Sequence, residues 1–106
     1  MLTPDGGRRT EKLTKTERFE LGNVVATPGA LDALEEAGLT PIHLIERHVR
    51  GDWGNLSDDD KAENELSLKQ GFRLLSSYEL PGSAQKVWVI TEADRSTTTL
   101  LLPSEY

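Results

Sequence analysis

The chain has 106 residues, of which 36% are hydrophobic and 28% charged, a balance that is typical of one globular domain and excludes a disordered chain. It contains no cysteine, which excludes disulfides, thiolate metal ligands and a cysteine nucleophile. The formal net charge of −6 divides into +2 on residues 1–18 (five basic, three acidic) and −8 on residues 19–106 (seven basic, fifteen acidic), and this acidic body disfavours nucleic acid as a partner.

The first 18 residues are polar and contain Pro4, Gly6 and Gly7 without helical or alternating apolar spacing. We therefore expect a flexible arm over residues 1–18 and one folded domain over residues 19–106. No apolar stretch follows the basic residues of the arm, and no run approaches the roughly 18 residues of a membrane span. This pattern predicts a cytoplasmic protein that does not contact a membrane.

Two short helices are predicted from a repeated start signal, a threonine followed by a proline. Threonine can cap the first free amides, and proline fits the first helical position because its missing N–H is no loss there. The helices should cover about residues 28–37 and 41–50, each ended by a glycine. The expected buried positions are Leu31, Leu34, Ile42, Ile45 and Val49.

A third helix is predicted over residues 58–70. Ser57 supplies a capping hydroxyl, and three aspartates follow in the first turn, where the helix dipole favours negative charge. The aspartates lack the spacing of a calcium loop, and capping already explains them, so we expect no metal site. The expected apolar side consists of Ala62, Leu66, Leu68 and Phe72.

The second half of the chain has the pattern of a β-meander. Residues 73–80 and 86–93 are rich in aliphatic and aromatic residues and flank Pro81-Gly82, which predicts a hairpin. A third strand should follow over residues 97–102, and residues 19–26 could add a short strand. The sequence therefore predicts an α+β fold, with three short N-terminal helices packed on a C-terminal antiparallel sheet of three to four strands.

Strand alternation assigns several polar residues to a face of this sheet. It places Thr91 on one side, and Glu92 with Trp88 on the other. Tyr78 shares a strand face with Ser76. That tyrosine either adds a polar end to a pocket or is an ordinary sheet tyrosine whose hydroxyl reaches the rim.

The first candidate site is the segment ERHVRGDWGN, residues 46–55, which crosses a helix end into a turn. His48 and Asp52 could form an acid/base pair, with Arg47 or Arg50 holding an anion. Alternatively, Trp53 fills the core, the aspartate satisfies turn amides, and the histidine caps the helix C-terminus through its charge.

The second candidate site is the predicted turn TEADRSTTT, residues 91–99. Asp94, Arg95 and Thr97 could recognise a phosphate or a carboxylate. Alternatively, the aspartate forms an ordinary turn, the arginine is solvated, and the threonines are present for their β propensity.

The segments LGNVVATPGAL, ERHVRGDWG, DDDKAENELSLKQGFRLLSSY and VWVITEADRSTTTLLLPSEY resemble a family of small proteins of bacterial plasmids and integrated mobile elements. The resemblance covers residues 19–106 and implies a genomic setting rather than a chemical activity. Some members of that family are labelled as the modification subunit of a type I restriction system, but this chain has neither the cofactor fold nor the Pro-Pro motif that a methyltransferase needs.

A strand around Arg73 is followed by a strand that ends in the polar residues 91–95, and this order is similar to that of barnase-like ribonucleases. In that family the catalytic histidine would fall at the position of Arg95, so His48 would have to replace it.

Three classes of function follow from these patterns. The first is a non-enzymatic accessory or regulatory module that binds a protein partner through residues 47–55 and 94–97, with inhibition of a host restriction or defence nuclease as a special case. The second is a metal-independent nuclease using His48, Arg73 and Arg95. The third is small-ligand binding around Trp53 and Trp88. None of the three requires a cofactor.

Overall fold

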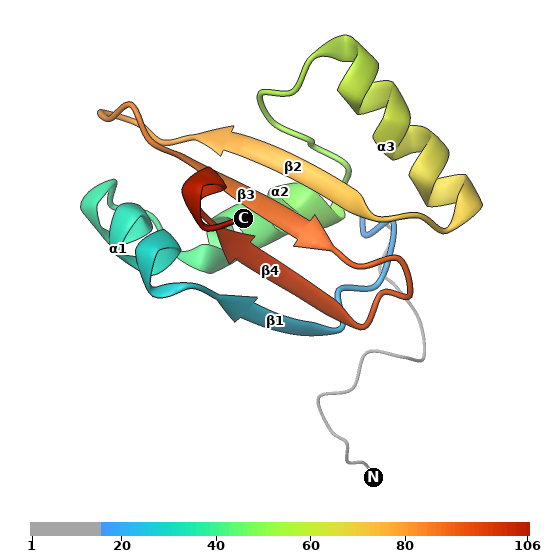
Figure 1. The fold of residues 1–106 in the computed structure, drawn as a ribbon, viewed down its shortest axis with the longest axis horizontal. Coiled ribbons are helices and arrows are strands. Elements are labelled where there is room, and N and C mark those ends of the chain that lie inside the picture. Colours follow the sequence, from blue (N-terminus) through green and yellow to red (C-terminus); the bar gives the residue numbers. More distant parts are fainter. Residues whose placement is uncertain (1–15) are drawn as a thin grey trace, which may run out of the picture.

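The computed structural model describes residues 16–106, and Figure 1 shows their arrangement. Within this range the chain forms three α-helices and four strands, which confirms the predicted α+β class. The elements are β1 (Asn23–Ala26), α1 (Pro28–Glu36), α2 (Pro41–Val49), α3 (Asp58–Gln70), β2 (Leu74–Glu79), β3 (Lys86–Thr91), β4 (Thr97–Leu101) and the 3-10 helix η1 (Pro103–Glu105). No helix in the described range is long and apolar enough to cross a membrane.

Most of the arm predicted over residues 1–18 lies outside the described residues. Arg18, at its end, is part of the folded structure. Its backbone N–H donates to Val49 O, and its guanidinium forms two hydrogen bonds of 2.9 Å with the carboxylate of Glu65. The chain therefore contacts the folded body already at this residue, one position before the predicted start at Phe19.

The four strands form one sheet in the order β1-β4-β3-β2. The β2–β3 hairpin and the β3–β4 pair are antiparallel, as predicted. However, β1 pairs with β4 in parallel, with Asn23 opposite Thr97, so the sheet is mixed rather than wholly antiparallel. This is possible because the helices and the hairpin separate the two strands, and a parallel pair needs such a long crossover.

The helix boundaries agree closely with the predicted ones because their signals are local. Thr27 accepts a hydrogen bond from Ala30 N, and Ser57 accepts one from Asp60 N, as capping requires. Thr40 precedes α2 without making a side-chain cap, so there the proline alone favours the helix start. The predicted stop of α3 at Gly71 is confirmed, with φ 79° in the left-handed region.

Helices α1 and α2 pack on one face of the sheet, called the inner face here; in Figure 1, α2 lies behind the sheet and α1 lies beside its left end. Leu34, Ile45 and Val49 are buried as expected, but Leu31 is 44% exposed and Ile42 is 61% exposed. The predicted burial of Leu31 and Ile42 was wrong because each helix packs a slightly rotated face against the sheet, which carries Ala30 and Ala33 in α1 and Leu44 in α2. The core residues from α1 and α2 are Ala30, Ala33, Leu34, Leu44 and Ile45.

Helix α3 lies beside the outer edge of β2 rather than on the inner face (Figure 1). Its buried residues are Asn64 and Ser67, whereas Leu66 is 45% exposed and Phe72, just beyond the helix, is 54% exposed. Of the predicted apolar side, Leu68 packs against the core cluster of Phe19, Trp53 and Leu74 as expected, whereas the predicted burial of Ala62, Leu66 and Phe72 was wrong. A sheet edge presents unpaired backbone groups, and the Asn64 amide satisfies them by donating to Leu75 O and accepting from Leu75 N.

The segment between α2 and α3 covers the rest of this edge. Asn55 N donates to Ser77 O, and Ser77 N donates to Trp53 O, so the segment pairs with β2. Gly54 lies between them with φ 78°, and a Cβ there would stand 2.1 Å from Ser77 O. Only glycine fits this close approach.

Candidate functional site

The sheet separates the predicted site residues onto two faces. The strand register places Ser76, Tyr78 and Thr91 on the inner face, all completely buried. Arg73, just before β2, and Trp88 belong to the outer face, where they line one pocket. The predicted alternation along β3 is confirmed.

His48 lies on the inner face at the centre of a buried polar relay. Its Nδ1 is 2.6 Å from Ser76 Oγ, and its Nε2 is 3.0 Å from Thr91 Oγ1. Thr91 Oγ1 is 2.7 Å from Thr98 Oγ1, which donates to Leu21 O at 2.8 Å. One hydrogen-bonded chain thus connects α2 with β2, β3, β4 and the segment before β1.

The direction of this relay follows from counting protons. Thr98 has one hydroxyl proton and donates it to Leu21 O, so it must accept from Thr91. Thr91 then has no proton left for the imidazole and accepts from Nε2–H of His48. The remaining nitrogen, Nδ1, is the acceptor for the Ser76 hydroxyl. His48 is therefore the neutral Nε2–H tautomer.

Aromatic rings enclose the imidazole. Phe19 and Trp53 meet it edge to face, with ring centroids 5.1 and 5.9 Å away. Burial, with a smaller contribution from the positive charge of Arg95, lowers the pKa of His48 to about 3. His48 is neutral and 0% exposed, so a substrate cannot reach it in this conformation, and it does not cap the helix through a charge.

The acid/base pair proposed for residues 46–55 does not form. The Asp52 carboxylate pairs with Arg47 at 2.7 Å and accepts a hydrogen bond from Gly54 N, away from His48. The pKa of Asp52 is lowered, chiefly by the hydrogen bond from Arg47. Trp53 is a core residue, 3% exposed, as the structural alternative predicted.

Two further residues of the first candidate site differ in how the fold uses them. The guanidinium of Arg47 also lies over the ring of Tyr78, 4.5 Å from its centroid. Tyr78 is completely buried, and its hydroxyl donates to Asp52 O, so it does not reach a rim. Burial raises the pKa of Tyr78. Arg50 is exposed just after α2; its backbone N–H donates to His48 O, and its side chain has no partner within residues 16–106.

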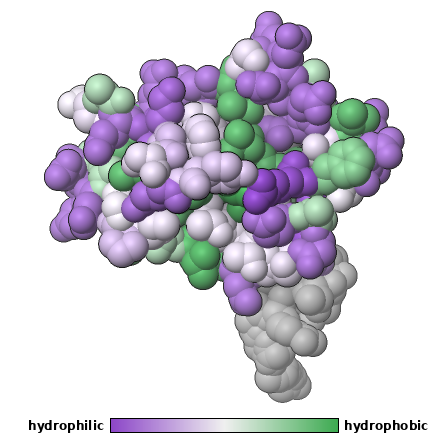
Figure 2. Space-filling view, viewed as in Figure 1, coloured by the Kyte–Doolittle hydropathy of each residue, from purple (hydrophilic) through white to green (hydrophobic). Residues whose placement is uncertain are grey.

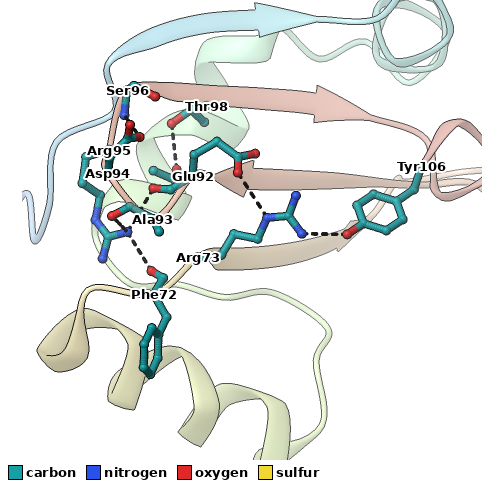
Figure 3. A network of polar contacts seen from close by, with 10 residues as sticks. Phe72, Arg73, Glu92, Ala93, Asp94, Arg95, Ser96, Thr98 and Tyr106 are labelled. Atoms are coloured by element: carbon teal, nitrogen blue, oxygen red, sulfur yellow. Dashed lines mark hydrogen bonds and ion pairs between the residues drawn. The ribbon is translucent and has the colours of Figure 1, made fainter.

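The second candidate site, around residues 94–97, is also occupied by structural contacts, as Figure 3 shows. Asp94 accepts from Ser96 N, which confirms the turn alternative. Arg95 has φ 61°, and its guanidinium donates to four backbone carbonyls, so the expectation of a solvated arginine was wrong. Thr97 is half-buried and pairs with Asn23 in the sheet. The four carbonyls belong to Ser67, Phe72, Glu92 and Ala93.

The nuclease candidates do not converge. His48 is sealed on the inner face, and Arg73 lies on the outer face with the sheet between them. Arg95 approaches the inner-face cluster only through Phe19, with its Cζ 5.9 Å from the centroid of that ring. No single surface exposes all three side chains.

The outer face carries a pocket of about 290 Å³ lined by Arg73, Leu75, Trp88, Ile90 and Tyr106. Its wall is mostly apolar, and Figure 2 shows a strip of hydrophobic side chains over this part of the surface. Tyr106 meets Trp88 edge to face, with ring centroids 5.6 Å apart. None of the three α-helices within residues 16–106 packs on this face, and only the short 3-10 helix η1 lies over one end of it (Figure 1).

Helix η1 places Tyr106 over this face. The side chain of Glu105 accepts hydrogen bonds from the Thr27 hydroxyl at 2.6 Å and from Leu102 N at 2.8 Å. The end of the described chain is therefore fixed to the start of α1. The sequence hypotheses missed the role of Tyr106 in the pocket; the available signal was an aromatic residue just after Pro103, which ends the last strand.

Arg73 has hydrogen-bonding capacity that the fold does not use. Its Nη1 donates to the Tyr106 hydroxyl at 2.7 Å, and its Nε donates to Glu92 at 3.3 Å (Figure 3). A guanidinium has five N–H donors, so three remain without a partner among the described residues. The side chain is 49% exposed, so these donors are accessible to a ligand.

No group of three or more His, Asp or Glu side chains within residues 16–106 is arranged to hold a metal ion. Compared with known proteins, the chain matches no family model, no curated protein and no solved structure. The geometry of the outer-face pocket is therefore the basis for a functional proposal.

Proposed function

We propose that this domain is a protein-binding module whose partner docks on the outer face of the sheet, at the pocket lined by Arg73, Trp88 and Tyr106. The single observation that carries the proposal is a half-exposed arginine with three unused donors beside an apolar, aromatic-lined hollow. Arginine, tryptophan and tyrosine are the residues that most often contribute large binding energies at protein interfaces.

This proposal keeps the protein-binding function expected from the sequence but assigns the binding surface to the outer-face pocket. In the two segments first considered, residues 47–55 and 94–97, side chains such as Arg47 and Arg95 already form hydrogen bonds within the monomer. A regulatory role in a mobile element, or inhibition of a defence nuclease, remains a proposal based on the family resemblance. The separation of His48 from Arg73 disfavours the nuclease alternative.

A comparison of two arginine variants tests the proposal. The full chain is immobilised and exposed to host-cell lysate, and the retained proteins are identified by mass spectrometry. The variant Arg73→Gln should lose a partner that the wild type and the matched control Arg50→Gln both retain. Removing one interface anchor typically weakens binding by about tenfold or more. Identical sets of captured proteins for all three chains would show that the outer face is not the docking surface.

A further inference from the structure

The outer-face pocket has a chemistry that narrows what can occupy it. We propose that it receives a carboxylate carried on a compact apolar group, presented by the C-terminal residue of the partner protein. This inference rests on the proposed function, because it names the part of the partner that enters the site. It is argued from the donors, size and charge of the pocket.

The free donors favour a carboxylate. The two N–H groups on Nη2 of Arg73 and the second one on Nη1 have no acceptor among the described residues. A planar carboxylate accepts two parallel hydrogen bonds from such a fork, which a single carbonyl oxygen cannot do. The Tyr106 hydroxyl accepts from Arg73, and its own proton has no acceptor within residues 16–106, so it supplies another donor at the same place.

The wall and the volume favour a small apolar group next to that carboxylate. Leu75 and Ile90 form the floor, and Trp88 and Tyr106 provide aromatic rings. The volume of about 290 Å³ is at the lower limit of small-molecule sites, which start at roughly 300 Å³. One leucine or phenylalanine side chain is suitable in size, whereas a nucleotide is not.

The surrounding charge favours a single negative charge over a double one. Glu92 lies 3.3 Å from Nε of Arg73, so an incoming anion meets an opposing carboxylate as well as the guanidinium. The folded body, residues 19–106, also carries −8 (seven basic, fifteen acidic). Because Glu92 offsets much of the attraction to the guanidinium, a phosphate dianion would experience about twice the remaining repulsion from the acidic body. A carboxylate carries one charge and has the planar geometry that the fork matches.

Fluorescence of Trp88 provides the test. The protein is titrated with 3-phenylpropionate and with its uncharged counterpart 3-phenylpropanamide, and then with a short peptide ending in phenylalanine as the free acid or as the amide. Each acid should give a saturable change that Trp88→Phe abolishes, and each amide should bind about tenfold more weakly or worse, because it loses the charge-assisted pair of hydrogen bonds.

Three variants separate the electrostatic contributions. Arg73→Gln should weaken the binding of both acids by about tenfold or more, and Arg50→Gln should leave it unchanged. Glu92→Gln should tighten the binding of the acids by about threefold, since it removes a like charge while keeping a side-chain acceptor for Arg73. A purely structural Glu92–Arg73 pair would give the opposite sign. Thermal unfolding of each variant confirms that it is folded.

Equal binding of the acid and the amide, or unchanged acid binding by Arg73→Gln, would overturn the carboxylate inference. Binding of 3-phenylpropionate without binding of the free-acid peptide would overturn the partner's C-terminus as the occupant and indicate a small organic acid. If neither acid binds while lysate capture still depends on Arg73, the inference fails and the protein-binding proposal survives.

Discussion

Mild acid, between pH 7 and pH 5, should destabilise this fold chiefly through His48. Its pKa is about 3 in the native state because it is buried, and about 6.5 in an unfolded chain. A native state that binds the proton less readily than the unfolded state is fully stable above the unfolded pKa. It loses stability as the pH falls from about 6.5 towards 3.

The size of this effect follows from the two pKa values. Between pH 7 and pH 5 the unfolded chain becomes protonated at His48 while the native state does not, which costs about 2 kcal/mol. With a urea dependence of about 1–2 kcal/mol per molar for a domain of this size, the midpoint should fall by about 1–2 M. The pKa values of Asp52 and Glu65 are lowered, chiefly by hydrogen bonds from Arg47 and Arg18, so the stability that these carboxylates contribute is lost at lower pH than that of His48.

Urea unfolding of the wild type at pH 7 and pH 5, followed by circular dichroism, measures the shift. His48→Gln keeps an amide donor and an acceptor near Ser76 and Thr91 but cannot titrate, so most of its shift should disappear even if the variant is less stable. His43→Gln, an exposed substitution on the same helix, should retain the full shift. An equal pH dependence in the wild type and His48→Gln would refute the assignment.

The structure makes three further predictions. Asn64→Ala should cost about 1–3 kcal/mol in urea unfolding, because two backbone groups on β2 lose their partner, whereas the exposed neighbour Glu63→Ala should change stability by less than about 0.5 kcal/mol. Gly54→Ala should destabilise the fold much more than Gly82→Ala, since both have positive φ but only the first brings a Cβ to 2.1 Å from a backbone oxygen; similar losses for the two variants would contradict this argument. Glu105→Ala should change the emission of the outer-face tryptophan while leaving the far-ultraviolet spectrum intact, because it releases the C-terminal turn that carries the neighbouring tyrosine.

Sequence reasoning identified the elements because their signals are local. The Thr-Pro starts, the serine cap and the glycine stops each act within one helical turn, so the bounds of all three helices were predicted closely. It was only partly right on helix faces, where tertiary context decides: Leu34, Ile45 and Val49 are buried as expected, whereas Leu31 and Ile42 are exposed. Leu66 belongs to a regular helical pattern but remains exposed, because α3 packs on a strand edge that requires the amide of Asn64.

The polar relay was beyond sequence reasoning for a different reason. Its four side chains come from α2, β2, β3 and β4, and only the strand register brings them into contact. His48 was recognised as unusual from its position beside apolar residues, but the same pattern suits an exposed base and a buried acceptor equally well. A buried polar network is stable only when every member has its partner, so the relay favours this register over a shifted one.

Arg73 and Arg95 show how the structure distinguishes binding groups from structural ones. Both lie in connections at the same end of the sheet, Arg73 just before β2 and Arg95 between β3 and β4, and their sequence contexts give no reason to distinguish them. Arg95 donates to four carbonyls and holds the 92–97 turn against the segment after α3, so its charge is committed to the fold. Arg73 makes two hydrogen bonds and keeps three donors without a partner within residues 16–106, on the outer face. Since a group already satisfied in the monomer gains little from a partner, the capacity to bind lies with Arg73 rather than with the more conspicuous turn.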